Sequence, residues 1–66
     1  MRTLSEIQKE MGIAQNAYNE RYNWYRECIR DPFKKSYAQD AFNRLEETER
    51  WITRLQEEEE SLLSRF

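Results

Sequence analysis

The sequence predicts an all-α protein, an antiparallel hairpin of two helices over about residues 4–30 and 33–64. Three observations favour this fold. Apolar residues recur at helical spacing in both halves of the chain, one Asp-Pro step separates the halves, and no run alternates apolar and polar residues as a strand does. With 66 residues, the chain is one domain, residues 1–66. A chain of this size buries only about 60% of its unfolded surface. We therefore expect burial to be completed in a four-helix dimer or a higher oligomer.

The first predicted helix begins at two overlapping capping boxes, which start at Thr3 and Ser5. Gly12 lies inside this helix and costs about 1 kcal/mol relative to Ala, so it marks either a close helix approach or a first segment that frays. The apolar residues follow spacings of three and four, which gathers them on one face: Leu4, Ile7, Met11, Ala14, Tyr18, Tyr22, Tyr25 and Ile29.

The break between the helices falls at Asp31-Pro32. Proline disfavours helical geometry at the residue before it, so the first helix is expected to stop near Ile29 or Arg30. Asp31 is also a good N-cap with Pro32 at the first helical position. Ser36, followed three residues later by Gln, is a second cap candidate. The sequence thus leaves two starts open for the second helix, Pro32 and about Ser36.

The second predicted helix carries a heptad repeat. Thr48 and Glu59 interrupt it, and Phe42, Trp51 and Leu63 widen it, which suits a bundle more than a two-stranded coiled coil. The Glu46 and Arg50 side chains form a favourable i,i+4 pair. The repeat alternates spacings of three and four through Ala38, Ala41, Leu45, Thr48, Ile52, Leu55, Glu59, Leu62 and Phe66.

The composition argues against catalysis and cofactor binding. The chain has no His, the commonest general base and metal ligand, and its single Cys, Cys28, is interpreted as a small core or rim residue. The run Glu57–Glu60 points around a helix, so we expect a solvated face and no metal site. One Gly cannot build a phosphate-binding loop. We predict a protein that is not an enzyme and holds no cofactor.

Charge and hydropathy limit the partners. The net charge is −2, with +2 over residues 1–35 and −4 over residues 36–66, so duplex DNA is not an expected partner. No stretch is long and apolar enough for a membrane span, and the N-terminus does not have the pattern of a signal peptide. We expect a cytoplasmic protein that does not contact a membrane.

The candidate binding residues combine aromatic rings with positive charge. Residues 16–25 hold four of the nine aromatics, and residues 21–35 carry a charge of +3. Aromatics are favoured at protein interfaces, while the same residue types stack bases and pair with phosphates. The candidate residues for a partner or ligand are Tyr22, Trp24, Tyr25, Arg26, Arg30, Lys34 and Lys35.

The segment Ser36–Glu46, which follows an aromatic first helix and a short linker, resembles small phage-encoded helical-hairpin proteins. One such group inhibits host regulatory proteins, and another comprises anti-defence sponges that sequester cyclic-nucleotide signals. The proline-containing and basic ligand motifs of the sponges are not recognisable here, so no binding residue is carried over.

Three functional hypotheses follow. The first is a self-associating interaction protein that binds and inhibits or sequesters a protein target, as the resemblance to phage inhibitors implies. The second is an oligomeric sponge whose subunit interfaces hold a phosphate-bearing nucleotide, with Tyr22 or Trp24 stacking its base. The third is a coiled-coil assembly or scaffold component, favoured by the heptad repeat of the second helix.

Overall fold

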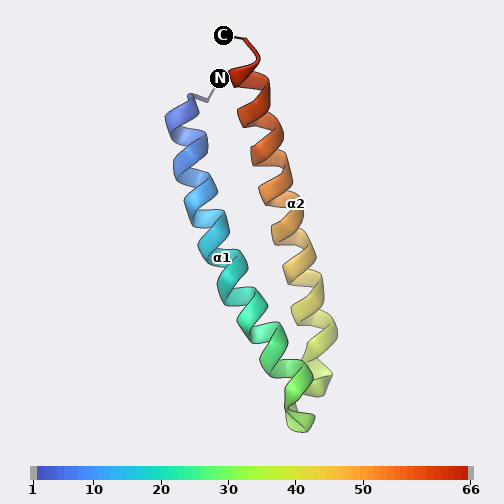
Figure 1. Ribbon diagram of the computed structural model, residues 1–66. Helices are drawn as coiled ribbons and strands as arrows, with labels where there is room; N and C mark the ends of the chain where they lie inside the picture. The colour runs from blue at the N-terminus through green and yellow to red at the C-terminus, as the bar shows by residue number, and fades with distance from the viewer. Residues whose placement is uncertain (1, 66) are drawn as a thin grey trace.

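The computed structural model describes residues 2–65 as a hairpin of two long helices that pack side by side (Figure 1). Helix α1 spans Leu4–Arg30, a short 3₁₀ helix, η1, spans Pro32–Tyr37, and helix α2 spans Ala38–Leu63. The molecule is a rod of 51 × 15 × 15 Å. We call the end with η1 the apex, and the end where α1 starts and α2 finishes the open end (Figure 1). The predicted all-α hairpin is confirmed.

Thr3 caps α1. Its side-chain oxygen accepts a hydrogen bond of 3.2 Å from the backbone N–H of Glu6, the third residue of the helix. This satisfies one of the N–H groups that a helix start leaves without an intrahelical partner. Of the two predicted capping boxes, the structure therefore shows the N-cap hydrogen bond of the one that begins at Thr3.

Asp31 makes the turn at the apex. Its backbone is extended, as expected before proline, and its own N–H still bonds the Glu27 carbonyl at 3.1 Å. Its carboxylate accepts a hydrogen bond of 2.9 Å from the N–H of Phe33. The helical path thus resumes at Pro32, one of the two predicted starts, but first as a 3₁₀ helix. Tyr37, not Ser36, is the N-cap residue of α2.

The buried core lies along the line where the helices meet. On α2, every predicted heptad position from Ala38 to Leu62 is buried or half-buried, whereas Phe66 lies outside the described residues. Ile7, Ala14 and Leu55 form one buried cluster, against which Met11, Trp51, Ile52 and Leu62 pack. The buried residues nearer the apex are Cys28, Ala41, Leu45 and Thr48.

The buried line on α1 differs from the prediction towards the apex. Tyr22 and Ile29 are exposed, while Arg21 is half-buried and Cys28 is fully buried. The predicted pair, Tyr22 and Ile29, and the observed pair, Arg21 and Cys28, both fit a helical period. Each predicted position is one residue, or about 100° of rotation, from the observed one. The prediction that Tyr22 and Ile29 lie on the core face is therefore wrong, whereas Cys28, interpreted as a core or rim residue, is in the core. Arg21 is tolerated near the core because it has a partner on α2, Thr48, that the sequence pattern does not reveal.

Arg2 joins both helices at the open end. Its guanidinium bonds Glu10 on α1 at 2.8 Å and Glu58 on α2 at 2.6 Å. Trp51 Nε1 also donates to Glu10, at 3.4 Å. These contacts hold the pKa of Glu10 below its usual range, first through the hydrogen bond from Arg2. The predicted pair of Glu46 with Arg50 also forms, at 3.8 Å.

Candidate interaction surface

The seven predicted binding residues lie in the apex half of the hairpin, but on two different flanks. Arg21 and Cys28 lie on the line where α1 contacts α2. Because each residue turns the helix by about 100°, Tyr22 and Trp24 lie on opposite sides of this line, about 160° apart. We call the two sides the tyrosine flank and the tryptophan flank. The first carries Tyr18, Tyr22, Tyr25 and Phe42, and the second carries Trp24 and Trp51.

A cluster on the tryptophan flank is built around Trp24. The Lys34 ammonium lies 5.5 Å from the centre of the Trp24 ring, and the Tyr37 ring lies 6.4 Å away at an angle of 41°. Lys34 is also paired with Glu27 at 2.6 Å, and this hydrogen bond raises the pKa of Lys34. Trp24 of α1 therefore contacts two residues of η1 while it remains exposed.

A second cluster lies on the tyrosine flank. The rings of Tyr18 and Tyr22 stack at 6.1 Å with 11° between their planes, and the Arg26 guanidinium lies 5.9 Å from the Tyr22 ring. The Tyr18 hydroxyl donates to Glu49 on α2 at 3.4 Å. Burial, followed by the charge of Glu49, raises the pKa of Tyr18. Two of the predicted binding residues, Tyr22 and Arg26, thus form a cation–π contact.

The remaining candidates have different surroundings. Tyr25 is half-buried, and its ring packs on Phe42 of α2 at 5.7 Å, so it holds the two helices together near the apex. Arg30 and Lys35 are exposed. Within one chain, the structure therefore brings Lys34 to Trp24 and Arg26 to Tyr22, and keeps these two pairs on separate flanks.

Two exposed aromatics at the apex are absent from the predicted set. Phe33 is 92% exposed, and Tyr37 is 56% exposed. A signal for Phe33 exists in the sequence, because it directly follows Pro32 in the turn and belongs to neither apolar repeat. We call Trp24, Phe33, Lys34 and Tyr37 the aromatic apex.

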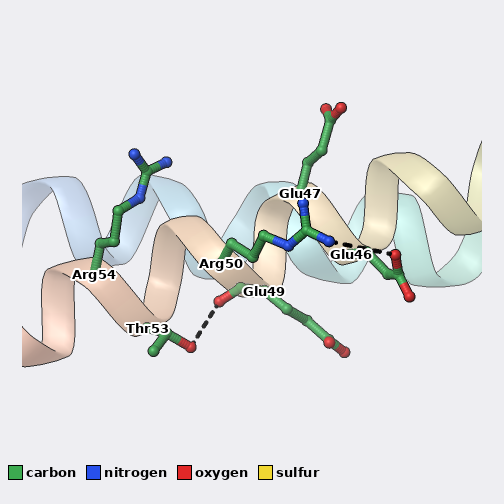
Figure 2. A pocket seen from close by; sticks show the side chains of 6 residues that line it. All are labelled: Glu46, Glu47, Glu49, Arg50, Thr53 and Arg54. Atoms are coloured by element: carbon green, nitrogen blue, oxygen red, sulfur yellow. Dashed lines mark hydrogen bonds and ion pairs between the residues drawn. The ribbon is translucent and has the colours of Figure 1, made fainter.

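A shallow depression is lined by six side chains, all from α2, and Figure 2 shows them leaving the helix in different directions. In it Arg50 pairs with Glu46, and the Thr53 hydroxyl donates to the Glu49 carbonyl at 2.9 Å. Because α1 supplies no opposing wall, this is an open helix face. Among residues 2–65, no group of three or more His, Cys, Asp or Glu residues is arranged to hold a metal ion.

No protein-family model, curated protein or solved structure matches this chain. The resemblance to phage-encoded hairpin proteins therefore stays a prediction. Over the described residues, neither long helix is sufficiently apolar to cross a membrane.

Proposed function

We propose that this chain is a non-enzymatic, self-associating interaction protein that binds a protein target through its aromatic apex and thereby inhibits or sequesters it. The observation that carries the proposal is Phe33, a large apolar ring that is 92% exposed at the tip of the hairpin. Exposed apolar surface rimmed by polar groups is typical of protein interaction sites. Aromatic anchors supply much of the binding energy at such sites.

The structure supports this role because the apex is ordered before it meets a partner. Pro32 restricts the backbone directly before Phe33, and the Asp31 carboxylate holds the Phe33 N–H. Trp24 is held between Lys34 and Tyr37. Less side-chain freedom is then lost on binding, which favours affinity.

Exposed cations border the same region and indicate the chemistry of the target. Arg30 and Lys35 are exposed near the apex, and the basic residues of residues 21–35 outnumber the acidic ones by three. Cations at the rim of an interface favour an acidic partner surface and speed its association. The expected target thus has an apolar pocket for Phe33 with carboxylates around it.

The nucleotide-sponge hypothesis would require two copies to bring their cations together. Lys34 is already paired with Glu27, and Arg26 lies on the other flank. A thermal-shift screen with linear and cyclic nucleotides tests this hypothesis. A melting temperature raised by a saturating nucleotide would favour a ligand-binding protein over the proposal.

The direct test is quantitative affinity purification with three immobilised proteins. These are the wild type, Phe33→Ser, and Ile13→Ser, whose Ile13 is 62% exposed on α1 away from the apex. A target captured by wild type and Ile13→Ser, and lost with Phe33→Ser, is then purified. Titration calorimetry should show roughly 30-fold weaker binding for Phe33→Ser, as for an interface hot spot. Equal binding by all three proteins would exclude the apex. If the double variant of Trp24 and Arg26 loses binding, Trp24→Ala and Arg26→Ala made singly then show which flank contributes.

A further inference from the structure

The two flanks of the hairpin differ sharply in polarity. On the tyrosine flank, apolar side chains extend along the whole rod and lie roughly 40–120° from the line of contact between the helices. Tyr22, Ile29, Phe42 and Leu63 are 42%, 50%, 39% and 51% exposed. Six half-buried apolar residues lie on the same flank as these four exposed ones: Leu4, Met11, Tyr18, Tyr25, Ala38 and Ile52.

The tryptophan flank is charged by comparison. Helical rotation places the carboxylates of Glu10, Glu27 and Glu58 on the tryptophan flank. Arg2 pairs with Glu10 and Glu58 there, and Lys34 pairs with Glu27. Further charged residues on this flank are Glu6, Glu20, Asp40, Arg44, Glu47 and Arg54. The hairpin therefore has one flank with a continuous apolar surface, which no other part of the described chain covers, and one flank that is mostly charged apart from the exposed Ile13 and Trp24.

Charge is also separated along the rod. Near the apex, residues 20–44 contain six basic and four acidic residues, a charge of +2. At the open end, residues 2–12 and 55–65 together contain three basic and six acidic residues, a charge of −3. Two rods that lie antiparallel place each positive apex beside a negative open end. Two parallel rods place like charges together.

We propose that a second copy of the chain docks on the tyrosine flank in antiparallel orientation and forms a four-helix bundle with a twofold axis across the rod. This inference rests on the self-association part of the proposed function and names its surface and orientation. An isologous contact uses the same patch on both copies. The ten apolar residues of the tyrosine flank supply that patch, and the charges decide the orientation.

The symmetry fixes which helices meet. A twofold axis across the rod stacks α1 of one copy on α1 of the other and α2 on α2, with each pair of helices antiparallel. The apex of each copy then lies over the open end of the other.

The surface is tested by mass in solution. Multi-angle light scattering should give twice the 8.2 kDa of one chain for the wild type. Ile29→Glu and Leu63→Glu place a charge on the tyrosine flank at positions that the hairpin leaves exposed, so both should be monomeric and still helical by circular dichroism. Ile13→Glu, the matched control on the other flank, should stay dimeric. A monomeric wild type, or a dimer that all three variants leave intact, would overturn the proposal.

The orientation is tested separately by a distance between the two copies. Spin labels on Lys35→Cys in a Cys28→Ala background should lie about 45 Å apart in an antiparallel dimer and under about 25 Å apart in a parallel one. A distance under about 25 Å would refute the antiparallel arrangement. Phe33→Ser should remain dimeric, so failure of target binding and failure of self-association are distinguishable.

Discussion

The Arg21 guanidinium on α1 donates a hydrogen bond to the hydroxyl of Thr48, a fully buried residue on α2. The Thr48 hydroxyl in turn donates to the Arg44 carbonyl one turn earlier, at 2.9 Å. Two polar side chains therefore meet near the middle of the interface between the helices, and one of them, Thr48, occupies a heptad position of α2. Because each side chain satisfies the other, the pair is tolerated where an unpartnered hydroxyl or guanidinium would be costly.

Removing this hydroxyl should destabilise the hairpin. Thr48→Val keeps the shape of the side chain but leaves the half-buried Arg21 without its acceptor. Hydrogen bonds to charged groups contribute about 1.5–3 kcal/mol, so urea unfolding should show a loss in that range. Thr53→Val is the matched control, because the exposed Thr53 makes the same hydroxyl-to-carbonyl bond, also at 2.9 Å. Equal losses in the two variants would show that the bond from Arg21 contributes nothing.

The same pair shows what the sequence could and could not predict. Spacing and the Asp31-Pro32 break correctly gave two helices, the end of α1 and the heptad positions of α2. Apolar spacing places the line of contact on α1 one residue too far towards the apex, on Tyr22 and Ile29. It favours Tyr22 over Arg21 because the partner that accommodates Arg21 lies on the other helix. Such a contact appears only once the helices are in register.

The candidate surface was predictable in composition but not in arrangement. The excess of aromatic and basic residues over residues 16–35 is a sequence property. Its division between two flanks follows from where α2 lies, which sets Tyr22 and Trp24 on opposite sides. Helical periodicity does not indicate Phe33, because this residue is a single apolar side chain in a turn and belongs to neither repeat.

Truncating the core at the open end should be severe. Leu55 is fully buried against Ile7 and Ala14. Leu55→Ala should cost about 2–5 kcal/mol, comparable with the whole stability that so small a core supplies, about 3–5 kcal/mol. Ile7→Val, with an expected loss of about 0.5–1.5 kcal/mol, provides a measurable intermediate case. Ile13→Ala at an exposed position should change the unfolding free energy by less than about 0.5 kcal/mol, and a larger change would contradict the assigned core.

The Arg2–Glu10 contact predicts a dependence of stability on pH. The pKa of Glu10 is lowered in the folded protein, so the stability it contributes is complete above the ordinary carboxyl value of 4.5 and is lost as the pH falls through the lowered value. The difference in unfolding free energy between wild type and Glu10→Gln should be constant from about pH 7 to 5 and shrink below that. Glu47→Gln, at an exposed position on α2, serves as the control. A difference that grows on acidification would refute this role for Glu10.

The burial of Cys28 predicts a protected thiol. Desolvation raises its pKa, and the neighbouring Glu27 carboxylate adds to the shift. Because the thiolate is the reactive form, modification by a thiol reagent at pH 8 should be more than about tenfold slower in the folded protein than in urea. Ile13→Cys in a Cys28→Ala background places the thiol at an exposed position and should react at nearly the unfolded rate. A fast reaction of Cys28 itself would mean that the line of contact on α1 has been misplaced.

Gly12 is the remaining local weakness in α1, and no close approach of α2 explains it. A methyl group built at Gly12 meets nothing within 4 Å among the described residues, so no close helix approach requires glycine. Its backbone torsion φ is not positive, so Ala fits there without strain. Gly12→Ala should therefore raise the unfolding free energy by about 0.5–1 kcal/mol. In thermal denaturation, the stability of Gly12→Ser should lie between those of the wild type and Gly12→Ala. If Ala instead destabilises the protein or lowers the mass of the dimer, another copy must pack against this side of α1, and the tyrosine flank would not be the docking surface.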